Sequence, residues 1–159
     1  MSEIQIFENE QFGSIRTIEI DGMPWFVGKE VAVVLGYSKP LDAISRHIDE
    51  DDSVKHGLID SVGRIQNTIL INESGLYSLI LSSKLPSAKA FKRWVTAEVL
   101  PTIRRHGFYA TDETLDKMMN DTETAEKLFR ELKAEKIRTR ELEKKNQLLS
   151  EKANYYDNV

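Results

Sequence analysis

Cysteine is absent from the 159 residues of the chain. Its absence excludes disulfides, thiolate nucleophiles and every cysteine-based zinc or iron–sulfur site. The three histidines, His47, His56 and His106, are too far apart in sequence to form a local pair of metal ligands. Apolar runs are far shorter than a membrane span, and the first residues lack the basic and apolar regions of a signal peptide. We therefore expect a soluble intracellular protein.

The motifs of the common enzyme classes are also missing. The sequence contains no Gly-x-Gly-x-x-Gly motif, no phosphate-loop lysine motif and no Gly-x-Ser-x-Gly elbow. The acidic residues 49–52 offer oxygen ligands, but they lack the alternating spacing and the glycine of a calcium loop, so a solvated turn is the favoured interpretation. We predict no catalytic residues, no cofactor and no metal site.

Glycine and proline are missing from residues 111–159, whereas all four prolines and both tryptophans precede residue 110. A segment without these residues favours continuous helix, and tryptophans favour a packed core. The sequence therefore predicts a globular domain over residues 1–109 and a helical segment over residues 110–153. The fold class that we expect is α+β.

The globular part begins with a sheet. Residues 4–7, 14–20 and 23–27 are rich in β-branched and aromatic side chains, and Asp21-Gly22 between the last two runs is typical of a two-residue hairpin turn. Residues 54–59 and 64–71 predict a second hairpin around residues 60–63, which would serve as a wing. Asn72 is then expected to cap a helix through residue 83, with Leu76, Leu79 and Ile80 on its apolar face.

Two short helices lie between the hairpins. Residues 29–35 are expected to form a compact helix that ends at Gly36, and Pro40 suits the first turn of a second helix over residues 41–48. Leu41, Ile44 and Ile48 are expected to share its buried face. The pattern is that of a helix-turn-helix, although many helix pairs in protein cores share it.

A third helix over residues 87–105 has two unlike sides. At about 100° per residue, one side carries Ala88, Phe91, Trp94, Val95 and Val99, and the other carries Lys89, Lys92, Arg93 and Thr96. Pro101 is expected to kink or restart this helix. Glu98 falls on the apolar side, so we expect it to form a buried pair with an arginine or a hydroxyl.

Positive charge is concentrated locally in a chain whose net charge is −4. Residues 84–106 contain six basic residues and one acid, and a phosphate backbone would favour such a stripe through counterion release. A solvated helix face is the alternative, and Asp42 and the acids 49–52 would repel a duplex. The candidate residues for contact with nucleic acid or a partner protein are Ser38, Lys39, Arg46, Arg64, Lys84, Lys89, Lys92, Arg93, Arg104 and Arg105.

The helical segment fits a heptad repeat. Position a takes Met118, Ala125, Leu132, Thr139 and Asn146, and position d takes Asp121, Leu128, Glu135, Leu142 and Leu149. We expect a homo-oligomeric coiled coil over residues 115–150, with a solvated single helix as the alternative. The predicted oligomerisation residues are Met118, Ala125, Leu128, Leu132, Leu142, Asn146 and Leu149.

Three runs of the sequence resemble one family in the same order. Residues 25–37 (WFVGKEVAVVLGY), residues 71–80 (INESGLYSLI) and residues 90–104 (AFKRWVTAEVLPTIR) are similar to the BRO N-terminal domain. This domain occurs in phage and prophage antirepressors and in baculovirus repeated-ORF proteins. The resemblance covers about residues 3–109. Residues 154–159 resemble the opening of the C-terminal antirepressor domain, so the chain is expected to be a truncated or short version.

The resemblance implies a phage antirepressor in the cytoplasm of a bacterial host. Such a protein regulates the lysis–lysogeny switch by countering a phage repressor, with DNA as a second partner of the N-terminal domain. Two alternatives follow: a module that sequesters the repressor without affinity for DNA, and an oligomerisation scaffold for a missing C-terminal domain. Each would act without a membrane and without catalysis.

Overall fold

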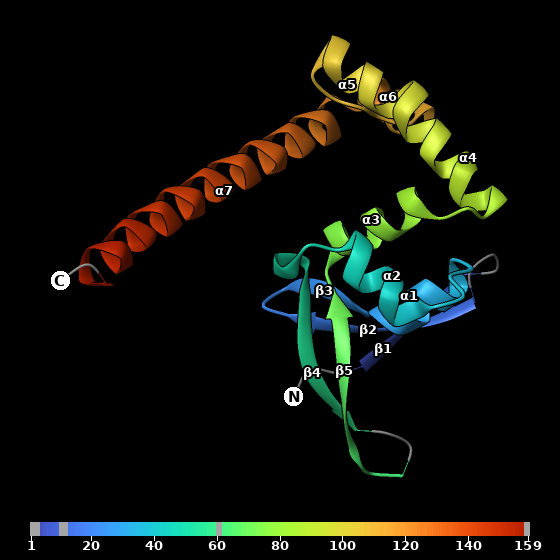
Figure 1. Cartoon of the computed structure of the whole chain (residues 1–159). Coiled ribbons are helices and arrows are strands. Elements are labelled where there is room, and N and C mark those ends of the chain that lie inside the picture. Colours follow the sequence, from blue (N-terminus) through green and yellow to red (C-terminus); the bar gives the residue numbers. More distant parts are fainter. Residues whose placement is uncertain (1–3, 10–12, 60–61, 158–159) are drawn as a thin grey trace. The chain divides into compact units, whose positions relative to one another are not determined.

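The computed structural model describes residues 4–9, 13–59 and 62–157. The chain forms two compact units, residues 1–107 and residues 108–159 (Figure 1). The first unit is an α+β fold, as predicted, and the second is helical. No helix in the described part of the chain combines the length and the apolar character needed to cross a membrane.

The first unit is built on a five-stranded antiparallel sheet. Its strands are β1 (Ile4–Asn9), β2 (Gly13–Ile20), β3 (Met23–Val27), β4 (Ser53–Ile59) and β5 (Ile65–Ile71), in the order β1-β2-β3-β5-β4. The predicted Asp21-Gly22 turn is confirmed, because Ile20 pairs with Met23 and both turn residues have positive φ angles, 53° and 77°.

The second hairpin, β4–β5, is continuous with the main sheet. Strand β5 pairs with β3 through Phe26–Ile71 and Val27–Leu70. The distal part of the hairpin extends beyond these pairs (Figure 1). The predicted second hairpin is therefore confirmed, with β5 joining it to the main sheet, and its use as a wing stays a prediction. Asp60 and Ser61 of the predicted turn lie outside the described residues.

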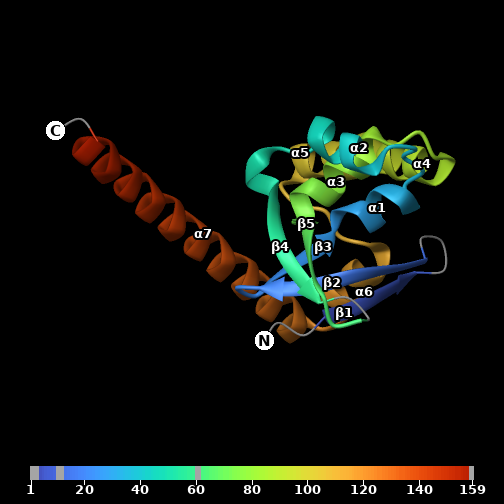
Figure 2. The same ribbon diagram turned by 60° about the horizontal axis from the view of Figure 1, so that its bottom comes forward.

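Helices α1 (Gly28–Val34) and α3 (Glu73–Ser82) cover one face of the sheet, and α2 (Pro40–His47) packs against these two helices (Figures 1 and 2). Side chains alternate between the two faces along each strand. Ile15 and Ile71 therefore join the helices in the larger apolar cluster, with Val31, Ala32, Leu35, Ala43, Ile44, Leu79 and Ala88. Ile18, Val27, Leu58 and Leu70 form a second cluster.

The helix pair α1–α2 follows the predicted signals. Gly36, with φ 77°, ends α1, and Pro40 begins α2. The buried face of α2 is centred between Ala43 and Ile44. This rotation leaves Leu41 at the edge of the face and 59% exposed. The prediction that Leu41 shares the buried face is wrong for that reason.

Helix α3 begins where Asn72 was expected to cap it. The backbone N–H of Gly75 donates to the Asn72 side-chain oxygen over 2.9 Å. Leu79 is fully buried, and Leu76 and Ile80 pack against the larger cluster. Both the cap and the apolar face predicted for this helix are confirmed.

The helix predicted over residues 87–105 contains an interruption. Helix α4 (Pro86–Trp94) passes into a π-helical turn, η2 (Val95–Val99), and continues as α5 (Leu100–His106). Pro101 has no backbone N–H for the preceding turn, and its ring crowds that turn, so a wider turn accommodates it. The predicted disturbance at Pro101 is confirmed, but a constant rotation of 100° per residue fails beyond Trp94.

Glu98 lies within this π-helical turn and is exposed. The predicted burial of its carboxylate is wrong, because the wider turn changes which side chains share a face and Trp94 beside it is itself 42% exposed. Exposure removes the desolvation cost that would have required a buried donor for this carboxylate.

The second unit consists of α6 (Asp112–Asn120) and α7 (Thr122–Asp157), which pack against each other. The rings of Phe108 and Phe129 meet edge to face, with their centroids 6.5 Å apart. The expected long C-terminal helix is confirmed in α7, but the helical segment as a whole does not form a single helix. The chain turns at Asp121 instead.

Asp121 is the residue that starts α7. Its carboxylate accepts hydrogen bonds from the backbone N–H groups of Glu123, over 3.1 Å, and Thr124, over 3.2 Å, and from the Thr124 hydroxyl. A residue that caps a helix lies outside the helix, so Asp121 does not occupy the heptad position d predicted for it. The Thr124 hydroxyl also holds the pKa of the Asp121 carboxyl below its usual value.

Candidate functional site

The predicted contact residues fall into three places on the first unit. Four of them line one cavity: Ser38, Lys39, Arg46 and Lys84. Three others project from α4: Lys89, Lys92 and Arg93. The remaining three lie elsewhere: Arg64, Arg104 and Arg105. The fold thus brings residues that are more than 40 positions apart in the sequence to one cavity. We treat this cavity as the candidate site.

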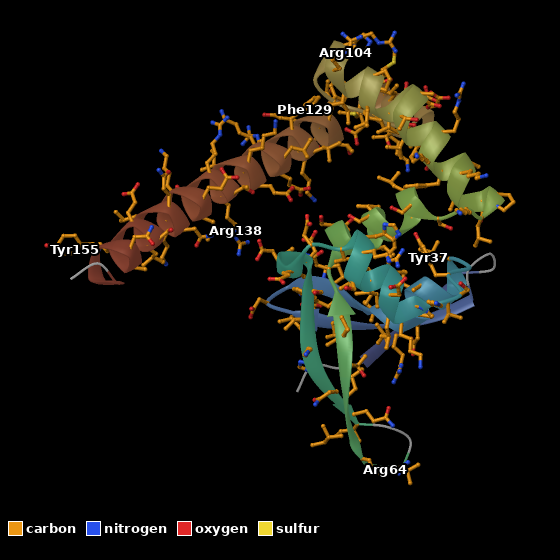
Figure 3. All side chains as sticks on the ribbon, in the orientation of Figure 1. Tyr37, Arg64, Arg104, Phe129, Arg138 and Tyr155 are labelled. Atoms are coloured by element: carbon orange, nitrogen blue, oxygen red, sulfur yellow. The ribbon has the colours of Figure 1, made fainter. Side chains whose placement is uncertain are left out.

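The cavity has a volume of about 580 Å³. It is bounded by the turn between α1 and α2, by one side of α2 and by the junction between α3 and α4. Tyr37 lies in this turn, between α2 and the start of α4 (Figure 3). This volume lies within the range of about 300–1,000 Å³ that small-molecule sites occupy.

The floor of the cavity is fixed by buried hydrogen bonds. The Ser83 hydroxyl donates to the carbonyl oxygen of Leu35 over 2.7 Å and accepts from the backbone N–H of Leu85 over 3.2 Å. A Cβ atom on Gly36 would lie 3.0 Å from the Leu85 side chain. These contacts hold the end of α1 against the α3–α4 junction, so the residues around the cavity stand on a rigid support.

One wall of the cavity is aromatic. The Tyr37 hydroxyl donates to the carbonyl oxygen of Leu79 over 2.7 Å, and its ring centroid lies 5.8 Å from that of His47. Burial raises the pKa of Tyr37, and a hydrogen bond with Ser82 opposes that shift. Tyr37 is therefore neutral at physiological pH and presents a ring surface together with His47.

Positive charge predominates around the cavity. Arg46 Nε lies 3.1 Å from Asp42 Oδ2, within one helical turn of α2. Lys39 and Lys84 have no ion pair within the described residues. The repulsion expected from Asp42 is thus reduced by Arg46, and two uncompensated ammonium groups remain at the cavity. An anion is the ligand class that this arrangement favours.

The outer side of α4 carries Lys89, Lys92 and Arg93, all exposed. None of the three forms an ion pair within the part of the chain that the structure describes. Arg16 shows the contrast, because its Nε donates to Glu30 over 2.7 Å and its backbone N–H donates to the same carboxylate. Arg16 thus stabilises the fold, whereas the α4 cations are available to a partner.

The other three predicted residues do not join the cavity. Arg64 lies near the tip of the β4–β5 hairpin and Arg104 lies on α5, at opposite ends of the first unit (Figure 3). Arg105 Nε donates to the carbonyl oxygen of Pro101 over 3.3 Å, within its own helix. The structure therefore does not unite all ten residues in one surface.

The acidic residues 49–52 have a local structural role. Asp52 accepts hydrogen bonds from the Asn72 amide over 2.9 Å and from the Ser74 hydroxyl over 2.8 Å. These bonds connect the short 3₁₀ helix η1 (Glu50–Asp52) to the start of α3. Across the described ranges, no group of three or more His, Asp or Glu side chains is arranged to hold a metal ion.

The predicted oligomerisation residues separate into two groups. Met118, Ala125 and Leu128 are partly buried where α6 meets α7. The others lie exposed along α7: Leu132, Leu142, Asn146 and Leu149. Only the second group is available to another chain, because the first already packs inside the helical hairpin.

Sequence reasoning missed Tyr37 and Ser82, which line the cavity together with His47. These three residues come from three different elements, and only the packing of α3 against α2 brings them to one cavity. Tyr37 had a signal in the sequence, since it follows Gly36 at the turn between two helices, where side chains often face a ligand. Ser82 had no such signal.

Comparison with known proteins gives one family. The model of the BRO family N-terminal domain matches residues 14–101. The Bro-N domain-containing protein 289L of Invertebrate iridescent virus 6 is 35% identical over 140 residues, which cover 77% of this chain and 33% of that protein. An uncharacterised protein of Haemophilus influenzae is 38% identical over 85 residues, 54% of this chain and 42% of that protein.

A third relative, the Bro-N domain-containing protein ORF2 of Autographa californica nuclear polyhedrosis virus, is 30% identical over 118 residues, 65% of this chain and 36% of that protein. The chain thus spans 33% to 42% of the length of these three relatives. No solved structure matches it.

Proposed function

We propose, on the premise that the chain belongs to the BRO family through its N-terminal domain, that the first unit is the DNA-contacting module of a phage antirepressor. In this role the protein counters a phage repressor and so regulates the switch between lysogeny and lytic growth. The module acts by binding and carries no catalytic step.

One observation carries the proposal: among the described residues, the exposed cations of α4 and the two lysines at the cavity, Lys39 and Lys84, form no ion pair. Lys89, Lys92 and Arg93 add nothing to the fold through ion pairs among the described residues. Cations of this kind gain most from a polyanion, because each phosphate contact releases a condensed counterion. The overall charge of −4 means that this attraction is local and depends on how the domain is oriented.

The cavity adds a second point of contact. Lys39 and Lys84 stand at its edge, and the rings of Tyr37 and His47 form a wall 5.8 Å apart at their centroids. Phosphate contacts fix the register of a protein on a duplex. Lys84 lies two residues before α4, so it connects the cavity with the cationic side of that helix.

Salt titration of DNA binding tests this function. We expect the anisotropy of a labelled duplex to report an affinity that falls steeply between about 50 and 200 mM salt. The variant K89E/K92E/R93E is expected to weaken binding by more than about tenfold and to reduce the salt slope by about 3, one unit for each lost phosphate contact.

A matched control reverses three exposed lysines of α7: Lys127→Glu, Lys133→Glu and Lys144→Glu. It makes the same change in net charge at a place outside the proposed surface, so binding should change by less than about threefold. Equal losses in both variants would show that only the total charge matters. Equal circular dichroism spectra of the two variants and the unmodified chain verify that all three are folded.

A protein-only mechanism has its own supporting observation. Leu100 and Ile103 on α5 are 54% and 41% exposed, beside the basic residues of the same helix. Apolar side chains rimmed by charge are typical of protein interfaces. If this mechanism holds instead, the chain retains the phage repressor in a pull-down while the duplex anisotropy stays flat at every salt concentration.

A further inference from the structure

We propose that α7 pairs with α7 of a second copy of the chain as a parallel two-stranded coiled coil over residues 131–150. The inference concerns the second unit and does not depend on DNA binding by the first. It names one occupant for the exposed side of α7 and one orientation for the pair.

The first argument is exposure. Every side chain from residue 131 to residue 155 is exposed, although α7 is 36 residues long. Leu132, Leu142 and Leu149 are 45%, 52% and 54% exposed. They occupy heptad positions a, d and d, so they lie along one line of the helix. A lone helix gains nothing from leucines in such a line, whereas a second helix would bury them.

The second argument is charge. With Leu132 at position a, the g positions of residues 131–150 are Glu131, Arg138 and Lys145, and the e positions are Lys136, Glu143 and the uncharged Ser150. In a parallel pair, each g side chain faces the e side chain of the next heptad on the partner helix. Glu131 then faces Lys136, and Arg138 faces Glu143. Both contacts join opposite charges, and each occurs twice in the symmetric pair.

The third argument is the polar residue within the seam. Asn146 occupies position a, where two asparagines hydrogen-bond across a parallel dimer and specify two strands in register. Thr139 occupies the a position one heptad before it. These two residues reduce the stability of the pair and increase its specificity, so a dimer with micromolar rather than nanomolar affinity is expected.

The beginning of the seam is set by the chain itself. Leu128 is partly buried near the contact between α6 and α7, and the ring of Phe129 packs on Phe108. The capped start of α7 at Asp121 gives the helix a fixed beginning. The surface open to a partner therefore begins after residue 130, which shortens the coiled coil expected from the sequence.

A single substitution at Glu135 should change the strength of the proposed dimer. It occupies a d position, so the two copies bring two carboxylates together at the seam, each beside Lys136 of the other helix. Glu135→Leu is expected to strengthen dimerisation by at least about tenfold, because it replaces a like-charge contact by an apolar layer. Leu142→Glu is expected to weaken it by a similar factor.

A single introduced cysteine tests the orientation, since the chain has none of its own. In the parallel pair, residue 149 faces its own copy, so the Leu149→Cys variant of the full chain should form a disulfide-linked dimer under mild oxidation at micromolar concentration. Lys144→Cys is the control, because heptad position f points away from the partner. It should give several-fold less cross-linked product.

Sedimentation equilibrium of the unmodified chain completes the test. A mass that rises from one chain to two over the micromolar range, shifted downward in concentration by Glu135→Leu, is the expected result. A monomer at all concentrations, equal cross-linking at positions 144 and 149, or a trimer would each overturn the proposal. Because none of these measurements contains DNA, their outcome is separate from that of the anisotropy experiment.

Discussion

The two units of the chain deal with their apolar side chains in opposite ways. In residues 1–107, leucines and isoleucines from the sheet and three helices converge on shared clusters, and Leu70, Ile71 and Leu79 are fully buried. In residues 108–159, burial is confined to the contact between α6 and α7, and leucines beyond it face solvent. The first unit has the core needed to fold by itself, whereas the second exposes leucines that the proposed coiled coil would bury.

Truncation of one leucine in each unit should show the largest difference. Leu79→Ala is expected to lower the free energy of unfolding by about 2–5 kcal/mol, because it leaves a cavity in a packed core. Leu142→Ala, at a site in the second unit that is 52% exposed, should change the free energy of unfolding of the first unit by less than about 0.5 kcal/mol. Urea unfolding followed by tryptophan fluorescence measures this, since both tryptophans lie in the first unit. Equal midpoints for the two variants would contradict the comparison.

Two glycines with similar backbone angles compare a packed position with an open one at the edge of the first unit. Gly36 has φ 77° and lies against Leu85, while Gly107, with φ 84°, has no atom within 4 Å of an added Cβ among the described residues. Each alanine substitution is expected to lower the free energy of unfolding by about 1–2 kcal/mol, because alanine is unfavourable in the left-handed conformation. Gly36→Ala is expected to cost more, because Leu85 must also move. Thermal melting of both variants measures the difference, and a greater loss in Gly107→Ala would refute it.

The smallest effect is expected at the cap of α7. Hydrogen bonds from Thr124 lower the pKa of Asp121 in the folded chain, so its carboxylate stabilises the helix above the usual value of 3.8. That stabilisation is lost as the pH falls through the lowered pKa. Circular dichroism at 222 nm should therefore show a small loss of helix below about pH 4. Asp121→Asn, which keeps an acceptor oxygen, should remove this component, and an unchanged pH profile would argue against it.

Local signals in the sequence predicted much of the first unit. Asp21-Gly22 requires positive φ angles, and Asn72 offers its side chain to a free N–H, so both features depend on neighbouring residues alone. The same holds for Gly36 and Pro40 at the ends of the helix pair. These elements were predictable because the physical cause lies within a few residues of the effect.

Two features could not be predicted in that way. The π-helical turn before Pro101 changes the rotation per residue, and a fixed period therefore misplaced Glu98 on the buried side. The cavity depends on contacts between α2 and the α3–α4 junction, which are about 40 residues apart, and no local pattern records such contacts. Half of the candidate site thus depended on tertiary packing.

The heptad assignment of Asp121 was a different kind of error, because the sequence contained the signal of a helix cap at this residue. The order Asp121, Thr122, Glu123, Thr124 is typical of a helix start, with a carboxylate in place to accept from the third following N–H. The heptad pattern assigned the same aspartate to a core position. Where a repeat and a capping signal disagree, the cap has the stronger physical basis, since an acid in a seam is costly.

The hydrogen bonds of the Ser83 hydroxyl distinguish two kinds of substitution in the BRO domain: those that disturb the scaffold and those that change only the rim of the cavity. It joins Leu35 and Leu85 beneath the cavity through hydrogen bonds that involve no charged group. Lys39, Arg46 and Lys84 are not needed to hold this floor in place. Side chains at the rim can therefore be exchanged, and with them the ligand that the proposed site would bind, while the scaffold below keeps its shape.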